Sequence, residues 1–492
     1  MLLQGQVTIK RKSARKDAEP PRYRKETPWA LPLRILCAFA SLRESFGFFN
    51  KPLRTLMPHP TFIDALRFWL KLGFISFGGP TGQIAIMHTE LVEKKKWISE
   101  TRFLHALNYC MLLPGPEAQQ LATYVGWLLH KTPGGLVAGA LFVLPSVFIL
   151  WGLSFVYVTY GKLDWIAAIF YGLKPAVMAI VAFAVIRLGK KALKNEVMWA
   201  LALLAFVAIF FFKIPFPLII LAAGIAGLAG GKIWPKKFLV TANHGAKNSG
   251  AQSVISDEDE SPLHTKPSLK RAIKVCAVCL ILWWTPVFLL GWWQGVTGTL
   301  FQQGIFFSKA AMVTFGGAYA VLPYVAQKAV EDYHWLNAGQ MLDGLGLAET
   351  TPGPLIMVLQ FVGFLGGWNH PGNLPPLVAA TLGAFITTWV TFVPCFLWIF
   401  LGAPHIEALR GSNNLTSALT SITSAVVGVV LNLAIWFGLH VLLPSEGVVD
   451  WFAVIVSVIT FVGMLKWNWN IIAVVVGSGL VGLIKHIGVS RL

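Results

Sequence analysis

The chain has 492 residues, of which 55% are hydrophobic and only 13% are charged. Soluble globular proteins carry about 25% charged residues. The 46 glycines and 20 tryptophans are typical of membrane proteins, in which glycine lets helices pack closely and tryptophan gathers at the interfaces. This composition excludes a disordered protein, a disulfide-stapled secreted domain and a soluble nucleic-acid-binding protein. We predict an all-α polytopic membrane protein, with apolar sequence for around ten spanning helices of about 20 residues each.

The first 60 residues are basic. The net charge of the chain is +18, and 12 of its 40 Lys and Arg lie in residues 1–60. Basic flanks stay in the cytoplasm and can contact the anionic headgroups of the lipid bilayer. We predict a cytoplasmic N-terminal segment over residues 1–60, with an interfacial helix in residues 31–49 and no cleavable signal peptide. A nucleic-acid partner is not expected, since nothing downstream would read bases.

Residues 68–116 recur 238 positions later, as residues 306–354, without a gap. Thirteen of the 49 aligned positions are identical, and they include Phe-Gly-Gly, a lysine, a tryptophan and Pro-Gly-Pro. Chance similarity between apolar helices would match Leu and Val instead. We infer an internal duplication, with membrane repeat 1 in residues 61–231, a cytoplasmic linker in 232–270 and membrane repeat 2 in 294–492.

An unpaired apolar run, residues 271–293, lies between the repeats. One extra transmembrane helix turns the second repeat upside down relative to the first. The charges agree with this: four basic residues follow Phe-Gly-Gly in repeat 1, whereas the matching stretch of repeat 2 has only Lys328. Inverted-topology repeats are typical of secondary transporters.

The same charge bias predicts which loops face the cytoplasm. Residues 293–304, 369–374 and 441–449 have no Lys or Arg and should face outward. We place the protein in the plasma membrane (the inner membrane if the cell is bacterial) with the N-terminus in the cytoplasm. The residues that mark the other cytoplasmic loops are Lys94, Lys95, Lys96, Arg102, Arg187, Lys190, Lys191 and Lys194.

Each repeat contains two broken helices. The breaks are Gly78-Gly79-Pro80 and Pro114-Gly115-Pro116 in repeat 1, and Gly316-Gly317 and Pro352-Gly353-Pro354 in repeat 2. The pieces on either side are shorter than the ~20 residues of a full span. Glycine allows a sharp reversal, and proline is favourable in the first turn of a helix. We interpret each segment as two half-helices, which form re-entrant hairpins.

A half-helix that begins inside the bilayer points free N–H groups and about half a positive charge at its N-terminus. Four such ends start near Pro80, Pro116, Ala318 and Pro354. If they meet at the midplane, they form a binding site for a tetrahedral oxyanion. The candidate substrate-binding residues are Lys71, Ser76, Gly78, Gly79, Thr81, Gln83, Gly115, Glu117, Gln119, Gln120, Lys309, Thr314, Gly316, Gly317, Thr350, Thr351 and Gly353.

Four ionisable residues lie in these apolar segments. Lys71 and Lys309 are equivalent in the two repeats, and a buried lysine is costly enough to indicate a function. The alternative is that each reaches the interface or neutralises a carboxylate. Glu117 and Glu349 flank the Pro-Gly-Pro turns and are candidates for proton coupling. A capping role at a helix start is the alternative, and it suits Glu117 better.

These motifs resemble those of the chromate ion transporter (CHR) family. The resemblance covers about residues 60–490, as in a long-chain, two-domain member, and it depends on residues 74–80 (Phe-Ile-Ser-Phe-Gly-Gly-Pro), 112–120, 313–319 and 350–355. It implies transport of chromate across the plasma membrane, commonly efflux that gives chromate resistance, with sulfate as a mimic. Because repeat 2 has Ala318 in place of Pro80 and Leu355 in place of Glu117, the two halves should contribute unequally.

We therefore expect a secondary transporter that moves chromate by alternating access. Sulfate or another anion is the alternative cargo, since the same donors would bind it. A membrane-embedded enzyme is a second alternative, but neither a zinc motif nor a paired-aspartate magnesium motif occurs. No Walker A motif occurs either, so ATP hydrolysis within this chain is not expected. The coupling ion is left open, and protons are one candidate. We expect no cofactor and no metal site, and association into a homodimer is left open.

Overall fold

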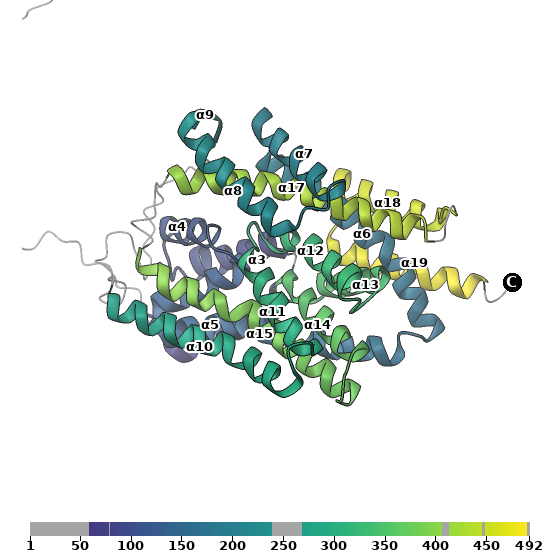
Figure 1. Ribbon diagram of the computed structural model, residues 1–492, viewed down its shortest axis with the longest axis horizontal. Helices are drawn as coiled ribbons and strands as arrows, with labels where there is room; N and C mark the ends of the chain where they lie inside the picture. The colour runs from purple at the N-terminus through teal and green to yellow at the C-terminus, as the bar shows by residue number, and fades with distance from the viewer. Residues whose placement is uncertain (1–58, 78, 239–267, 406–412, 445–447, 490–492) are drawn as a thin grey trace, which may run out of the picture. The chain divides into compact units, whose positions relative to one another are not determined.

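The computed structural model of the protein describes residues 59–77, 79–238, 268–405, 413–444 and 448–489 (Figure 1). The predicted interfacial helix at residues 31–49 and most of the N-terminal segment and the linker lie outside the described residues, as does Gly78. The described chain is built from helices and their connections, so the prediction of an all-α protein is confirmed.

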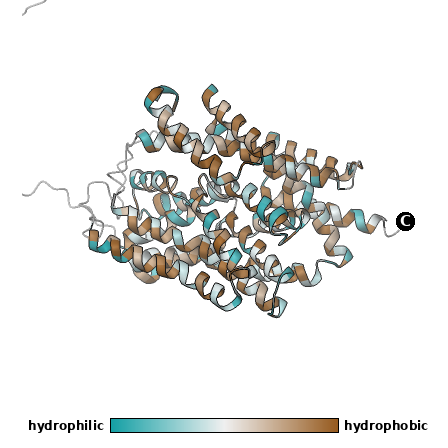
Figure 2. Ribbon diagram, in the orientation of Figure 1, coloured by the Kyte–Doolittle hydropathy of each residue, from teal (hydrophilic) through white to brown (hydrophobic). Residues whose placement is uncertain are grey.

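Seven of the described helices are long and apolar enough to cross a membrane. Much of their length is apolar, as the brown colour of Figure 2 shows. Many of their large apolar side chains are also exposed, and Trp292 is 88% exposed. Such surfaces are stable against hydrocarbon, where a helix satisfies its own backbone. The chain is therefore a polytopic membrane protein. The seven helices are α5 (Glu117–Tyr160), α6 (Asp164–Ala192), α8 (Phe216–Ile233), α10 (Leu269–Gln294), α15 (Pro376–Gly402), α17 (Asn413–Leu442) and α19 (Ile471–Val489).

The predicted half-helices are present in both repeats. In repeat 1, α5 is also kinked where His130 and Lys131 leave the helical conformation, so that its first part is a half-helix. The short helices are α2 (Phe62–Ile75), α3 (Gly79–His88), α4 (Glu100–Cys110), α11 (Thr299–Met312), α12 (Ala318–Gln327), α13 (Ala338–Thr350) and α14 (Val358–Asn369). The remaining helices are α7 (Glu196–Phe210), α9 (Pro235–Phe238) and α18 (Trp451–Trp467).

The duplication extends to local backbone details. Helices α3 and α12 each continue into a π-helical turn, η1 (Thr89–Lys94) and η3 (Lys328–Asp332). Each turn is followed by a residue in the left-handed region, Lys96 with φ 52° and His334 with φ 51°. The next helix then begins at a side-chain cap, Ser99 for α4 and Asn337 for α13. These caps satisfy N–H groups that a helix start leaves free.

The later helices of each repeat pack against those of the other repeat. Helix α6 of repeat 1 packs against α18 and α19 of repeat 2, and α17 of repeat 2 packs against α7 and α8 of repeat 1 (Figure 1). Helices α6 and α17 also pack against each other, as do α5 and α15. This pattern is that of two copies related by a twofold rotation.

The hairpins of repeat 1 open at one end of the helix bundle. His130, at the kink of α5, donates a 3.0 Å hydrogen bond to the carbonyl oxygen of Pro60, just before α2. At the start of α10, the Arg271 guanidinium lies 5.1 Å from the centre of the Trp127 ring, in the turn before that kink. The starts of α2 and α10 and the kink of α5 therefore share one end, which we call the first end.

The hairpins of repeat 2 open at the opposite, second end, to which the later part of α5 runs and where α6 begins. Tyr171 of α6 donates a 2.6 Å hydrogen bond to Asp450 at the start of α18. The N–H of Asp450 bonds to the carbonyl oxygen of Leu442, at the end of α17. Trp436 of α17 donates a 3.1 Å bond to Glu331 in η3, where the α11–α12 hairpin opens. The two repeats are therefore inverted.

Candidate functional site

The Pro-Gly-Pro turn of each repeat is hydrogen-bonded to the other repeat. The N–H of Gly115 donates to the carbonyl oxygen of Thr314, and the N–H of Gly353 donates to that of Ser76, both at 2.8 Å. Gly115 matches Gly353, and Ser76 matches Thr314, at the repeat distance of 238 residues. These bonds join the breaks in two pairs across the repeats, each pair made of one Pro-Gly-Pro turn and one Phe-Gly-Gly break. We call the region where these breaks lie the crossing.

Only glycine fits at the centre of each turn. Gly115 has φ 120° and Gly353 has φ 105°, both in the region that favours glycine. A Cβ on Gly115 would lie 2.8 Å from Sγ of Cys395, and a Cβ on Gly353 would lie 2.6 Å from Cβ of Ser146. Ser146 follows Pro145 in α5, and Cys395 follows Pro394 in α15, so each turn rests against a Pro-containing helix of the other repeat.

The two Phe-Gly-Gly breaks lie against each other. A Cβ on Gly317 would be 3.8 Å from Cγ of Pro80, which is in the first turn of α3. Gly79, Gly316 and Gly317 all have positive φ, which the reversal of the chain requires. The N-terminal ends of α3 and α12 thus face a shared region, to which their free N–H groups and dipoles give a positive potential.

Four of the predicted hydroxyl donors lie beside these turns, and each donates within its own segment. Ser76 and Thr314 are buried and donate 2.6 Å bonds to the carbonyl oxygens of the residues four positions earlier in α2 and α11. Thr350 and Thr351 donate to carbonyl oxygens of α13. Their protons reach an anion only after the side chains rotate. Thr81 lies in the first turn of α3.

Three buried glutamines of repeat 1 lie beside the helix breaks and have apolar counterparts in repeat 2. Gln83 donates a 2.5 Å hydrogen bond to the carbonyl oxygen of Gly353, across the repeats. Gln120 donates a 2.8 Å bond to the carbonyl oxygen of Pro114, and Gln119 donates to Thr123. An amide has two N–H donors, so each glutamine can direct one more at a ligand. The matching residues of repeat 2 are apolar: Val321, Met357 and Val358.

The two predicted lysines do not lie in the buried crossing. Lys71 on α2 and Lys309 on α11 are both exposed, and neither makes a hydrogen bond or ion pair with the described residues. Lys71 faces the first end, where it lies within electrostatic range of Glu90 together with Lys94 and Lys95. The role of Lys71 in anion binding stays a prediction. Lys71, Lys94 and Lys95 form a basic group at the first end, which we call the basic rim.

The two predicted coupling carboxylates differ in their surroundings. Glu349 is 4% exposed, at the end of α13, and accepts a hydrogen bond from the hydroxyl of Tyr319 in α12. Glu117 is the first residue of α5, where a carboxylate is stabilised by the helix dipole. Both stand beside a Pro-Gly-Pro turn, so protonation of either would change the charge next to the crossing.

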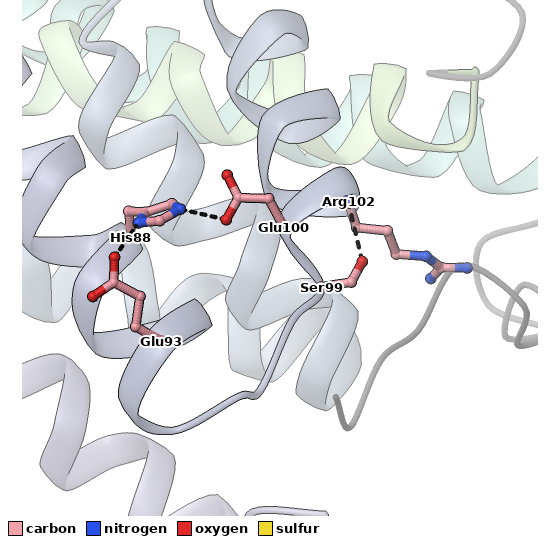
Figure 3. A network of polar contacts seen from close by, with 5 residues as sticks. All are labelled: His88, Glu93, Ser99, Glu100 and Arg102. Carbon is pink, nitrogen blue, oxygen red and sulfur yellow. Dashed lines mark hydrogen bonds and ion pairs between the residues drawn. The ribbon is translucent and has the colours of Figure 1, made fainter. Parts of the chain in front are cut away.

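A polar network closes the α3–α4 connection at the first end (Figure 3). The ring nitrogens of His88 lie 2.6 Å from a carboxylate oxygen of Glu100 and 3.2 Å from one of Glu93. The hydroxyl of Ser99 caps α4 by accepting a hydrogen bond from the backbone N–H of Arg102. Repeat 2 has alanine at the positions of His88 and Glu100, so this network belongs to repeat 1 alone. Within the described ranges, no group of three His, Cys, Asp or Glu could hold a metal ion.

One buried carboxylate, Asp343, was not predicted from the sequence. Asp343 of α13 is 3% exposed and accepts a 2.9 Å hydrogen bond from Tyr157 of α5. Lys174 of α6 lies 3.6 Å from the same carboxylate oxygen. The repeat alignment contains a sign of it, because Asp343 matches His105. Both repeats therefore have an ionisable residue at this position of the half-helix.

Comparison with known proteins agrees with the sequence motifs. The profile of the chromate transporter family matches residues 63–228 and 301–483, in both repeats. The chromate transport protein of Cupriavidus metallidurans is 28% identical over 435 residues, which cover 87% of this chain and 94% of that protein. The chromate transport protein of Pseudomonas aeruginosa is 28% identical over 422 residues, or 84% of this chain and 90% of that protein.

An uncharacterized transporter of Methanocaldococcus jannaschii is 25% identical over 429 residues, or 86% of this chain and 94% of that protein. No solved structure matches the chain. Two family matches that contain the two sets of broken helices, together with relatives aligned over most of their length, identify this chain as a member of the chromate transporter family.

Proposed function

We propose that this protein is a secondary transporter that exports chromate across the plasma membrane and thereby gives chromate resistance. One observation supports this most: the four helix breaks of two inverted repeats meet through reciprocal hydrogen bonds, Gly115 to Thr314 and Gly353 to Ser76. Helix N-termini that meet inside a membrane protein favour an anion, and a tetrahedral oxyanion can accept from several of them at once.

The binding step uses donors that the fold holds in place. The first turns of α3, α5 and α12 offer backbone N–H groups, and the glutamines Gln83, Gln119 and Gln120 offer their second amide N–H. Because most of these side-chain donors belong to repeat 1, the anion binds asymmetrically, closer to α3 and α5. Because the fold already holds these donors in place, they lose little conformational entropy when an anion binds, which favours binding.

Transport follows by alternating access. The hairpins of repeat 1 open at the first end and those of repeat 2 at the second end, so movement of each set exposes the crossing to a different side. The reciprocal hydrogen bonds keep the two sets in register at the centre. We propose that the hairpins of one repeat move relative to those of the other, with the repeats bounded by residues 61–231 and 294–492 and with α10 as the inverting helix.

We propose that the first end is cytoplasmic. It carries Lys94, Lys95 and Lys96 at and just after the end of η1, and Lys190 and Lys191 at the end of α6. The matching connection of repeat 2 at the second end pairs Lys328 with Asp332, so its net charge is lower. The positive-inside rule then places the N-terminus in the cytoplasm. The basic rim also concentrates a dianion at the entrance for export.

Glu117 and Glu349 are the coupling groups of this proposal. A carboxylate that binds a proton loses the charge that repels an anion, so proton and anion binding at adjacent positions become linked. Glu349 is the more enclosed of the two, and it accepts a hydrogen bond from Tyr319, in the first turn of α12.

Purified protein in proteoliposomes tests the function. We expect uptake of radioactive chromate into vesicles driven by a preset proton gradient, inhibition by excess sulfate, and none of this uptake in empty vesicles. Sulfate uptake that excess chromate does not inhibit would make sulfate the cargo. A wild-type protein that moves neither anion, at any proton or anion gradient, would overturn the proposal.

A further inference from the structure

Asp343 is an incompletely satisfied buried acid. Its Oδ2 accepts the 2.9 Å bond from Tyr157, while its Oδ1 is buried and has no hydrogen-bond partner among the described residues. Buried polar atoms in proteins nearly always have a partner. The unpaired oxygen makes the charged form of this acid costly to bury, which favours protonation more than at an exposed aspartate.

The charged form is held by one cation at an intermediate distance. Nζ of Lys174 lies 3.6 Å from Oδ2, which is too long for a hydrogen bond but close enough for an ion pair. Burial penalises the charged carboxylate, and the lysine offsets part of that penalty. The two forms of Asp343 are thus closer in free energy than those of an exposed aspartate.

Asp343 can exchange protons with one side of the membrane. Lys174 is 32% exposed, and its ammonium lies beside Gly339 in the first turn of α13, 3.2 Å from where a Cβ would stand. The cap of that helix, Asn337, is exposed at the second end. The partly exposed lysine and the exposed helix cap lie on the second-end side of Asp343, which makes the second end the nearer side for proton entry.

Two titratable residues from neighbouring helices act on the Asp343 carboxyl: Tyr157 of α5 and Lys174 of α6. The other elements packed against α13 are α14, α17, α19 and η4 (Leu355–Met357). In the described part of the chain, none of them adds a titratable group that acts on Asp343. Glu349 lies six residues later on the same helix, or about 9 Å deeper at 1.5 Å per residue.

We propose that Asp343 is a proton-binding site that couples proton entry from the second end to movement of the α13 hairpin. This inference depends on the proposed transport function and deepens it. When Asp343 is charged, its ion pair with Lys174 ties α13 of repeat 2 to α6 of repeat 1. When a proton binds, the pair is lost and the hairpin is released. In each cycle one proton binds to the carboxylate and the same proton is later released, so the only covalent change is that an O–H bond forms and then breaks.

The test separates coupling from binding. In proteoliposomes, chromate exchange between equal concentrations on both sides needs no proton release, whereas accumulation driven by a proton gradient does. We expect Asp343→Asn, which keeps the shape but cannot lose a proton, to exchange chromate within about twofold of the wild type. We expect the same variant to lose at least tenfold of the accumulation driven by the gradient. Asp332→Asn, an exposed acid at the same end, is the matched control and should do both.

A second variant changes the pH profile. Lys174→Gln removes the cation that favours the charged carboxylate, so the pH of half-maximal gradient-driven transport should move upward. Equal loss of exchange and accumulation in Asp343→Asn, or full accumulation by it, would overturn the proposal, as would an unmoved profile in Lys174→Gln. If the wild type exchanges sulfate but not chromate, only the proposal that chromate is the cargo fails. The role of Asp343 is then tested by the same comparison with sulfate. A wild type that exchanges neither would overturn both.

Discussion

The N–H of Gly353 lies 2.8 Å from the carbonyl oxygen of Ser76, so the Pro-Gly-Pro turn of repeat 2 is bonded to the end of the first half-helix of repeat 1. Its counterpart joins Gly115 to Thr314 at the same distance. These bonds use two N–H groups that would otherwise be free for an anion. The turns therefore build the frame of the site, and the neighbouring helix starts and glutamines supply its donors.

The glycines of the two turns should not tolerate a side chain. We expect Gly115→Ala and Gly353→Ala each to lower chromate transport at least tenfold while the protein still reaches the membrane, because a Cβ would collide with the helix behind the turn and strain a positive φ. Initial rates in vesicles, normalised to protein amount, measure this. Gly152→Ala is the control, since a Cβ there meets no atom within 4 Å. Wild-type rates in both turn variants would contradict the frame.

Gln83 should contribute directly to anion affinity. Gln83→Val puts at this position the residue that repeat 2 has, Val321, and removes both amide donors. A hydrogen bond to a charged group is worth about 1.5–3 kcal/mol, so the dissociation constant for chromate should rise roughly tenfold to a hundredfold. Binding to purified protein, by calorimetry, gives the value. An unchanged constant in a variant that melts like the wild type would place the anion away from α3.

Lys71 should act by its charge at the rim. Lys71→Ala is expected to lower the transport rate at least tenfold at low ionic strength, whereas Lys71→Arg should keep most of it, because attraction of a dianion depends on charge and is screened by salt. Lys274→Ala removes an exposed charge from α10 at the same end and serves as the control. Equal effects of the Lys71 and Lys274 substitutions would reduce Lys71 to a general surface charge.

Equivalent residues of the two repeats should face opposite sides of the membrane. In repeat 1, Lys95 lies over the rings of Phe68 and Trp97, and in repeat 2 the matching Tyr333 stacks on Trp335. With the five native cysteines replaced by alanine, Tyr333→Cys in intact cells should react with an impermeant maleimide, and Lys95→Cys should react only after the membrane is opened. Labelling of both residues from one side would refute the inverted arrangement.

The positions of the helix breaks could be predicted from the sequence because they depend on residue type. Glycine and proline stop a helix whatever surrounds them, and an exact spacing of 238 residues between Phe-Gly-Gly runs has no other simple explanation. Helices α3, α5 and α12 begin at Gly79, Glu117 and Ala318, within one residue of the starts expected near Pro80, Pro116 and Ala318. At the fourth start, expected near Pro354, the chain first forms a 3₁₀ turn over Leu355–Met357, and α14 begins at Val358.

The contacts between distant segments could not be predicted in the same way. Nothing local indicates that the carbonyl oxygen of Thr314 accepts from Gly115, or that Tyr157 and Lys174 converge on Asp343. The lysines show the converse problem: Lys71 and Lys309 interrupt apolar helices, yet both side chains are exposed, because a long side chain can leave a helix face that sequence alone does not orient.

The most direct measurement is anomalous diffraction at the chromium absorption edge from crystals grown with chromate. We expect a peak between the N-terminal turns of α3 and α12 and the first turn of α5, within hydrogen-bond distance of the Gln83 amide. A peak at the exposed lysines or on the lipid-facing surface, with none at the crossing of the four breaks, would contradict the proposed anion site.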